Sequence, residues 1–442
     1  MTKVLLVGAD GRSDCIADAI VRGGGTVHAL ATVKDHPGLR RKAAEVRSCV
    51  VADPETVVAF ARAVRPDLVV VAPEDPLARG VVDAIQRDLG TPCVGPTRAL
   101  ARIESSKSFT RALLDRHDIP GRIAHRVFTA ETVDGIEAYF RELGAFVVKA
   151  DGLMGGKGVK VFGDQLTSIE ESVAYARSLV TKGPVVVEEK IEGEEFSLQS
   201  LCDGASIVHT IPVQDHKRAY EGDTGPNTGG MGSYSAEDHA LPFLRPQHVA
   251  AAREINARVV KALQDEVGEP YRGVLYGGFM ATGRDVRLLE YNARFGDPEA
   301  MNVIPLLEGN FLDLCLAIAT GRLASTNVTF RRQATVCKYL VPRGYPDAPV
   351  KNETISLASL PSSTDALRVY FAAVQDTERG LVMTGSRAVA VVALADSISR
   401  AAELAEQAIA GVDGPVEHRR DIGMPVLLAR RVEHLATLSA RT

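Results

Sequence analysis

Short apolar runs alternate with helical patterns through the first hundred residues, and no other feature constrains the fold as strongly. The apolar runs cover residues 3–8, 26–31, 67–72 and 91–95. Between the first two runs, apolar residues recur at helical spacing at Ile16, Ala19 and Ile20. Strands that are joined by helices pair in parallel through right-handed crossovers. The pattern therefore predicts a doubly wound α/β domain over residues 1–102, with ligands at the carboxyl ends of its strands.

The rest of the chain indicates two further domains, because 442 residues are too many for one hydrophobic core. Strand patterns follow at residues 145–150, 158–162, 183–204 and 273–299. The third stretch is interpreted as two strands joined by an acidic turn, and the fourth as a hairpin. From about residue 330 the pattern changes to short strands and one helix. We expect a middle domain over 103–325 and a mixed C-terminal domain over 326–442, which gives an α/β and α+β multidomain fold.

Charge and cysteine usage exclude several classes of function. The 51 basic and 56 acidic side chains give a net charge of −5, which argues against nucleic acid as a partner. No apolar run approaches the length of a membrane span, and the opening stretch has no signal pattern. The six cysteines are far apart and form no CxxC pair. We therefore expect a cytoplasmic protein with reduced thiols and no membrane partner.

The stretch "KADGLMGGKGVKV", residues 149–161, is typical of a loop that holds phosphates. It is not a P-loop, because Asp151 occupies the place of the first glycine and Gly158 that of the Ser or Thr. What remains is a glycine-rich hairpin that follows Lys149. Glycines allow backbone amides to approach phosphate oxygens, and a lysine adds a point charge. A tight turn with solvated lysines is the alternative.

The loop after the first strand fails the dinucleotide fingerprint. Starting at Gly8, the second and third glycines are replaced by Asp10 and Ser13. A nicotinamide-dependent enzyme is therefore not expected.

The run "LLEYNARFGDPE" predicts a metal site at the end of the hairpin. Glu290 and Asn292 are two residues apart on a strand, so their side chains share one face. Carboxylate and amide oxygens suit Mg²⁺ that bridges phosphates, although Mn²⁺ is an alternative. Arg294 follows on the same face and could bind an anion. An exposed polar strand face is the other interpretation.

The chain resembles the ATP-grasp superfamily and, within it, the phosphoribosylamine–glycine ligase family, most closely the archaeal branch. The resemblance rests on "GPTRALARIESSKSFT", the glycine-rich hairpin, "EEKIEGEE", "QDHKR", "DTGPNTGGMG", "FGDPE" and "HRRDIG". It covers nearly the whole chain. It implies a Rossmann-like N-terminal domain, an ATP-grasp domain of two lobes with the small lobe at about 120–186, and a small C-terminal domain.

The resemblance also implies roles for individual residues. The residues implied for ATP are Lys107, Lys149, Gly152, Gly155, Gly156, Lys157 and Gly158 at the phosphates, Glu188 and Ile191 at the adenine, and Glu195 at the ribose. The residues implied for the other substrates are Gly8, Gly11, Arg12, Asp215, Lys217, Asn227, Gly230, Arg294 and Asp297. Among all of these, the resemblance implies that Lys149, Asp215 and Arg294 are catalytic, and that Glu290 and Asn292 hold magnesium.

The implied reaction is the ATP-dependent joining of a carboxylate to an amine through an acyl phosphate, with glycine and 5-phosphoribosylamine as substrates in purine biosynthesis. One departure leaves the amine open. The family's first loop is G-x-G-G-R-E-H-A, whereas here Ser13 and Asp14 replace the Glu and His and Asp10 replaces a glycine. Carboxylates near a phosphate repel it. The alternatives are a paralogous ligase of specialised metabolism for another amino acid or amine, and a non-catalytic scaffold. We expect a monomer or homodimer.

Overall fold

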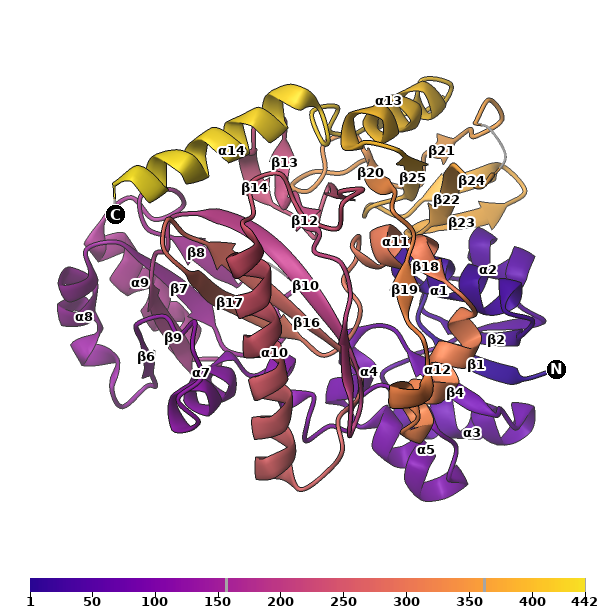
Figure 1. The fold of residues 1–442 in the computed structure, drawn as a ribbon, viewed down its shortest axis with the longest axis horizontal. Coiled ribbons are helices and arrows are strands. Elements are labelled where there is room, and N and C mark those ends of the chain that lie inside the picture. The colour runs from indigo at the N-terminus through magenta and orange to yellow at the C-terminus, as the bar shows by residue number, and fades with distance from the viewer. Residues whose placement is uncertain (156–157, 361–362, 442) are drawn as a thin grey trace.

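The N-terminal region forms a five-stranded parallel sheet in the order β3-β2-β1-β4-β5. The computed structural model describes residues 1–155, 158–360 and 363–441 (Figure 1). The strands are β1 (Lys3–Val7), β2 (Thr26–Ala31), β3 (Glu45–Ser48), β4 (Leu68–Val71) and β5 (Cys93–Val94). The helices are α1 (Gly11–Arg22), α2 (Pro37–Lys42), α3 (Pro54–Val64), α4 (Glu74–Ala78) and α5 (Val81–Leu89). The predicted doubly wound domain is confirmed, but β3 was missed because its side chains are mostly exposed and polar.

A small antiparallel lobe follows, with strand order β6-β9-β7-β8. Its elements are β6 (His125–Phe128), η1 (Val133–Gly135), α8 (Ile136–Leu143), β7 (Phe146–Ala150), β8 (Val159–Val161), α9 (Ile169–Val180) and β9 (Val185–Glu189). Its buried side chains form a hydrophobic core separate from that of the rest of the described chain. Phe140 and Phe146 stack in this core with ring centroids 4.1 Å apart. A lobe with its own core can move as a unit.

The large lobe contains an antiparallel sheet in the order β11-β10-β16-β17. Its strands are β10 (Glu194–Asp203), β11 (Ile207–His209), β16 (Arg272–Ala281) and β17 (Val286–Asn292). Its helices are α6 (Arg102–Ser105), α7 (Lys107–Arg116), α10 (Pro246–Val267), α11 (Ala300–Val303), α12 (Phe311–Thr320), η2 (Ile304–Leu306) and η3 (Leu323–Ser325). The predicted hairpin is confirmed as β16 and β17. The two strands predicted over 183–204 exist as β9 and β10, but each joins a different sheet, so the acidic turn is a linker between lobes.

The C-terminal region builds a sheet in the order β12-β15-β20-β25-β22, with β26 (Val416–Glu417) paired to β20. Its strands are β12 (Gln214–Asp215), β15 (Gly232–Ser235), β20 (Ala334–Pro342), β22 (Leu367–Phe371) and β25 (Val389–Ala395). Two of them, β12 and β15, come from the middle of the chain. The sheet therefore crosses the predicted boundary at 325–326, and the division into domains stays a prediction.

Smaller elements complete the described chain. They are the pair β13 (Arg218–Tyr220) and β14 (Thr224–Asn227), the pair β18 (Leu307–Glu308) and β19 (Thr329–Phe330), a sheet of β21 (Thr354–Ile355), β24 (Gly380–Met383) and β23 (Val374–Thr377), and the helices α13 (Ile398–Ile409) and α14 (Pro425–Ala440). In Figure 1, α14 runs past β13 and β14 toward the side of the molecule that holds the small lobe. Among the described helices, none combines the length and apolar character that crossing a membrane requires.

Candidate active site

The glycine-rich hairpin between β7 and β8 is tied to the first turn of α7. The Asp151 carboxylate accepts hydrogen bonds from the Lys107 amide (2.5 Å) and the Ser106 hydroxyl (3.1 Å). The Lys107 ammonium in turn donates to the Gly152 carbonyl (2.9 Å). Burial lowers the pKa of Lys107, and Glu290 opposes that change. A lysine on α7 is thereby placed at the base of the hairpin, close to the end of β17.

The glycines in this hairpin serve backbone conformations that other residues adopt at a cost. Gly152 and Gly155 have φ of 101° and 54°, in the left-handed region. At Gly158 an added Cβ would lie 2.7 Å from the side chain of Met154. Two predicted members of the loop lie outside the described residues: Gly156 and Lys157.

Lys149, on β7, is held by a buried triad of charges. Its ammonium lies 2.7 Å from Glu188 Oε2, and Arg111 binds both oxygens of Glu188 at 2.6 and 2.9 Å. Burial raises the pKa of Glu188, but Arg111 and Lys149 outweigh burial and lower it to about 2. Arg111 also donates to the carbonyls of Leu288 and Leu289 on β17. Glu188 was predicted at the adenine. In the structure both of its oxygens bind Arg111, and one of them also binds and orients Lys149.

Glu290 and Lys217 meet beside this triad. The Lys217 ammonium lies 3.3 Å from Glu290 Oε1 and 3.2 Å from Glu195 Oε2. The Lys217 charge lowers the pKa of Glu290 to about 2 against the effect of burial, with help from Lys149 and Lys107. Three lysines from separate segments therefore surround one carboxylate at the end of β17. Lysines can bind the oxygens of a polyphosphate, and the carboxylate can bind a divalent cation, so this arrangement could hold both.

Asn292 lies two residues further along, next to a buried carboxylate that the sequence analysis missed. Its amide is satisfied when Nδ2 donates to Glu104 Oε1 (2.9 Å), which leaves Oδ1 free to act as a ligand. The described residues contain no cluster of three or more His, Cys, Asp or Glu side chains suited to a metal. One carboxylate and one amide still fit Mg²⁺, which takes few protein ligands when phosphates supply the rest.

Arg294 lies two residues beyond Asn292, and two carboxylates hold its side chain. Its guanidinium lies 2.9 Å from Glu104 Oε1 and 3.4 Å from Glu74 Oε2. Burial lowers the pKa of Arg294, but Glu104 and Glu74 outweigh burial and raise it. Glu74 also lies 3.9 Å from Arg12, which donates to the Phe295 carbonyl at 2.6 Å. Two arginines from different domains are thus fixed on one side of the site.

The altered first loop adds no uncompensated negative charge. Asp10 caps α1 through the Ser13 amide (2.8 Å) and pairs with Arg12, and its pKa is lowered although burial alone would raise it. The Asp14 carboxylate is buried, 2.5 Å from the Lys42 ammonium, and accepts a hydrogen bond from the Phe371 amide (2.9 Å). Each of these carboxylates has a cationic partner that offsets its charge. The repulsion of a substrate phosphate by this loop stays a prediction.

A cleft of about 430 Å³ lies at the carboxyl ends of β1 to β4 and is closed on its other side by the C-terminal region. Gly8, Asp297 and Arg387 line it. Asp297 accepts a hydrogen bond from the Tyr339 hydroxyl (2.6 Å) and lies 3.2 Å from Arg387. At Gly11 an added Cβ would lie 2.2 Å from the Tyr339 hydroxyl. A parallel sheet predicts a ligand at this edge.

The remaining predicted residues surround these groups. Burial and Glu299 raise the pKa of Asp215 well above its usual value. At Gly230 an added Cβ would lie 2.6 Å from Asp215 Oδ1, and Arg387 donates to the Gly230 carbonyl (3.0 Å). Asn227 ends β14, and Ile191 is half-buried in the linker between the lobes.

The sequence analysis missed Arg111, Glu104, Glu74, Tyr339 and Arg387. Glu104 stands in a motif that was recognised, so local sequence could have indicated it. Tyr339 and Arg387 come from strands far along the chain, and nothing in their local sequence indicates the site.

Family comparison covers the chain in three parts. The models that match are phosphoribosylglycinamide synthetase N domain at residues 2–104, ATP-grasp (A) domain at 105–300 and C domain at 335–425. Among curated proteins, the phosphoribosylamine–glycine ligase of Methanocaldococcus jannaschii is 43% identical over 444 residues, with 99% of each chain covered. That of Methanosarcina barkeri is 42% identical over 438 residues, again with 99% of each covered.

Solved structures give the same picture. The phosphoribosylamine–glycine ligase of Thermotoga maritima superposes with a TM-score of 0.80 at 28% identity, covering 95% of this chain and 100% of its own. A biotin carboxylase from Campylobacter jejuni, solved as a β-γ-ATP complex, has a TM-score of 0.75 at 14% identity and 99% coverage of both chains. The second likeness is one of fold alone.

Proposed function

The chain belongs to the phosphoribosylglycinamide synthetase family of ATP-grasp enzymes, and on this premise we propose that it joins glycine to 5-phosphoribosylamine to give glycinamide ribonucleotide. It is an ATP-dependent ligase. The observation that supports the proposal most is the convergence of Lys107, Lys149 and Lys217 on Glu290. The cationic partners of the first loop's carboxylates weaken the reason to favour a paralogue with a different amine.

The reaction has two steps. A carboxylate oxygen of glycine attacks the γ-phosphorus of ATP, the bond to ADP breaks, and glycyl phosphate forms. The amine nitrogen of phosphoribosylamine then attacks the carbonyl carbon, a C–N bond forms, and phosphate leaves with the bonding electrons. No covalent enzyme intermediate is required, so the protein contributes position and charge.

The ATP tail lies between the glycine-rich hairpin and β17 in this proposal. Lys107 and Lys149 contact its phosphates, and the backbone at Gly152, Gly155 and Gly158 covers them. The hairpin then excludes water from the acyl phosphate. Ile191 borders the adenine, and Glu195 faces the ribose. Glu290 and Asn292 would hold a magnesium ion, which would supply positive charge at the phosphates.

The second half of the site takes the carboxylate and the amine. Arg294 binds the glycine carboxylate, and the cleft beside Gly8 and Arg12 receives the phosphoribosyl group. Asp215 faces the phosphoribosyl substrate, and burial together with Glu299 raises its pKa well above the usual value. All six cysteines are unpaired, which supports a cytoplasmic place of action.

An ADP-release assay tests the proposal. We expect ADP and phosphate to form only when glycine and phosphoribosylamine are both present, with glycinamide ribonucleotide detected by mass spectrometry. Ammonia, glycinamide and other primary amines serve as controls for the amine, and alanine and serine for the carboxylate. Turnover with another pair at a higher kcat/KM would overturn the substrate assignment while leaving the ligase chemistry intact.

A further inference from the structure

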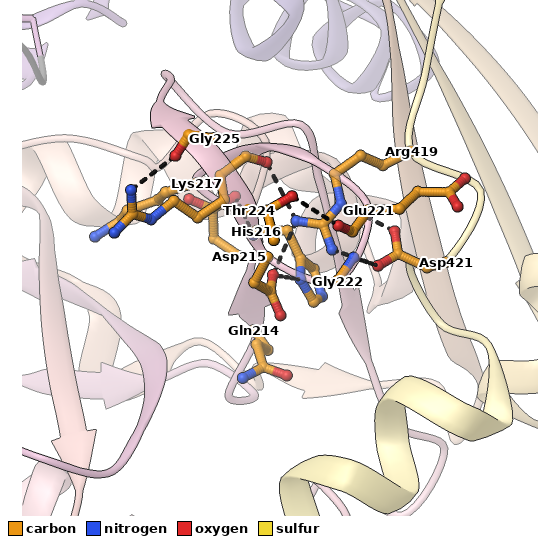
Figure 2. A network of polar contacts seen from close by, with 12 residues as sticks. Gln214, Asp215, His216, Lys217, Glu221, Gly222, Thr224, Gly225, Arg419 and Asp421 are labelled. Atoms are coloured by element: carbon orange, nitrogen blue, oxygen red, sulfur yellow. Dashed lines mark hydrogen bonds and ion pairs between the residues drawn. The ribbon is translucent and has the colours of Figure 1, made fainter. Parts of the chain in front are cut away.

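The segment "HRRDIG" of the sequence lies far along the chain from the site, yet it reaches the strand pair that directly follows Lys217. That pair, β13 and β14, is called the β13–β14 hairpin below and spans residues 218–227. Figure 2 shows Arg419 and Asp421 beside Gly222 and Thr224 of this hairpin, with Lys217 at its start. The roles proposed so far leave both C-terminal residues unused.

Arg419 is 1% exposed, and each of its three guanidinium nitrogens has an oxygen partner. Two of them bind the Asp421 carboxylate at 2.9 and 2.7 Å. The third donates to Asp223 Oδ1 (2.8 Å) and to the Arg218 carbonyl (3.2 Å). The Gly222 amide donates to Asp421 Oδ2 (2.9 Å). We call these contacts of Arg419 and Asp421 with the hairpin the clamp. Arg419 therefore holds both the turn of the hairpin and its first residue.

The clamp reaches Lys217 through the backbone. The carbonyl of Arg218, which follows Lys217 directly, accepts from Arg419. The carbonyl of Lys217 itself accepts from the amide and hydroxyl of Thr228 at 2.7 and 2.9 Å. A lysine side chain has many rotamers, so ordering it costs conformational entropy. A fixed backbone on both sides limits where its ammonium can go.

Attachment of the C-terminal segment does not require Arg419. Lys338 donates to the Arg420 carbonyl at 2.8 Å, and His418 lies 3.1 Å from Glu406 on α13. Ile422 is fully buried in the main core. These contacts hold the segment to its own domain, so the contact with the Arg218 carbonyl serves the hairpin.

We propose that Arg419 is a positioning residue that acts through the β13–β14 hairpin to set the Lys217 ammonium between Glu195 and Glu290. The inference deepens the proposed function and rests on it. Through this contact the C-terminal domain supplies part of the nucleotide site without touching the nucleotide. Loss of the Arg419 guanidinium leaves the turn of the hairpin bound through Arg431, which pairs with Asp223, and Arg430, which donates to the Gly222 carbonyl. It releases the Arg218 carbonyl, and with it the backbone that aims Lys217.

A double-mutant cycle with Lys217 tests the inference. Arg419→Lys keeps the charge but cannot bind Asp421 with two nitrogens and also reach Arg218. We expect it to lower kcat at least tenfold with little change in the KM for glycine. In the Lys217→Ala background the same change should cost less than twofold. Equal losses in both backgrounds would show a merely structural role and overturn the inference, as would unchanged kcat in Arg419→Lys.

Two further variants serve as a substitute for Arg419→Lys and as a control. Asp421→Asn weakens the same clamp with a smaller change in structure. If thermal unfolding shows that Arg419→Lys is not folded, Asp421→Asn takes its place and should show the same loss of kcat. Arg430→Lys is the matched control, because Arg430 donates to the Gly222 carbonyl (3.1 Å) but not to Arg218. It should keep the kcat of the wild type. If Asp421→Asn folds and also keeps that kcat, the inference fails.

A binding measurement separates this inference from the proposed function. Calorimetric titration with MgATP needs no amine, so it reports on the coupling of Arg419 to Lys217 even if the assigned amine is wrong. Non-additive effects on the Kd for MgATP support the inference. Additive effects count against it, whatever the ADP-release assay shows for glycine and phosphoribosylamine.

Discussion

At the scale of single residues, the site depends on buried charges that neutralise one another. Glu188 stands between Arg111 and Lys149, and each of its oxygens has a cationic partner. Removal of one member of such a group leaves an uncompensated charge in the interior, which costs about 3–5 kcal/mol. The triad therefore fixes Lys149 only as long as all three members are present.

Glu188→Gln is expected to lower the free energy of unfolding by about 3–5 kcal/mol, because Arg111 and Lys149 both lose their counter-charge. Glu189→Gln is the control. Glu189 is half-buried at the end of the same strand and accepts one hydrogen bond from the Ala124 amide (2.9 Å), so its loss should cost about 1 kcal/mol. Urea unfolding at pH 7 measures both.

The Glu188 effect should also depend on pH. The pKa of Glu188 is lowered from 4.5 to about 2 in the folded chain, so its ionised form stabilises the fold above pH 4.5. That stabilisation disappears as the pH falls from 4.5 toward 2. The difference in unfolding free energy between wild type and Glu188→Gln should therefore shrink over that interval. A difference that stays constant from pH 7 to pH 3 contradicts the assignment.

Glu290→Gln should lower the rate of ADP release by about 10²–10³, because it removes a proposed metal ligand and the partner of Lys217. The matched control is Glu192→Gln. Glu192 is exposed in the linker between the lobes, so this substitution should leave the rate of ADP release unchanged. Raising the Mg²⁺ concentration should recover part of the Glu290→Gln loss. Near-normal activity of Glu290→Gln at low Mg²⁺ would show that Glu290 is not a metal ligand.

At the scale of elements, the β13–β14 hairpin also touches the small lobe. Arg218 forms an ion pair with Asp164, which follows β8, and donates to the Gly225 carbonyl at 2.7 Å. The small lobe has its own core, so it can open and close over the nucleotide as a unit. The ion pair between Arg218 and Asp164 therefore links the β13–β14 hairpin to the small lobe.

Arg218→Asp is expected to raise the KM for ATP about fivefold, which corresponds to about 1 kcal/mol for a partly exposed pair. The double reversal Arg218→Asp with Asp164→Arg should restore most of the wild-type KM. The control is Arg177→Asp, which breaks an exposed pair with Asp134 within the small lobe. If the double reversal is no better than Arg218→Asp alone, this ion pair does not hold the lobe closed.

Local pattern predicted most elements but not their partners. The periodicity of residues 183–204 indicates two strands, and both form, yet nothing in that stretch shows that the sheet changes between them. Ser106, which caps α7, separates α6 from α7. The polar stretch 214–235 hides four short strands, because strands of two to four residues carry too few side chains for a detectable period.

At the scale of the whole molecule, the C-terminal sheet joins segments from both halves of the chain. β15 pairs with β20, and β12 pairs with β15, so the loop that carries Lys217 depends on a strand at Ala334–Pro342. The charged residues that the structure gathers around Glu290 were predicted from local motifs, and their role at ATP stays a prediction. The sequence could not predict Arg387 or Arg419, which reach the site only through this sheet and its neighbours.

A chain that ends at residue 330 should lose ligase activity, because β15 loses its partner and the clamp on the β13–β14 hairpin disappears. We expect weak MgATP binding and faster proteolysis within residues 214–235 than in the full chain. Adding the separate 331–442 fragment should restore part of the binding. A truncated chain that binds MgATP as tightly as the full chain would show that the two parts are energetically independent.

The shared sheet has a consequence for how the protein is made. On the ribosome, β12 and β15 emerge well before β20, the strand that must fix them. Until synthesis reaches that strand, the segment that carries Lys217 lacks the sheet that positions it, so we expect an unfinished polypeptide left by stalled translation not to consume ATP. Synthesis of the last quarter of the chain is thus required before a segment near its middle can take its place in the site.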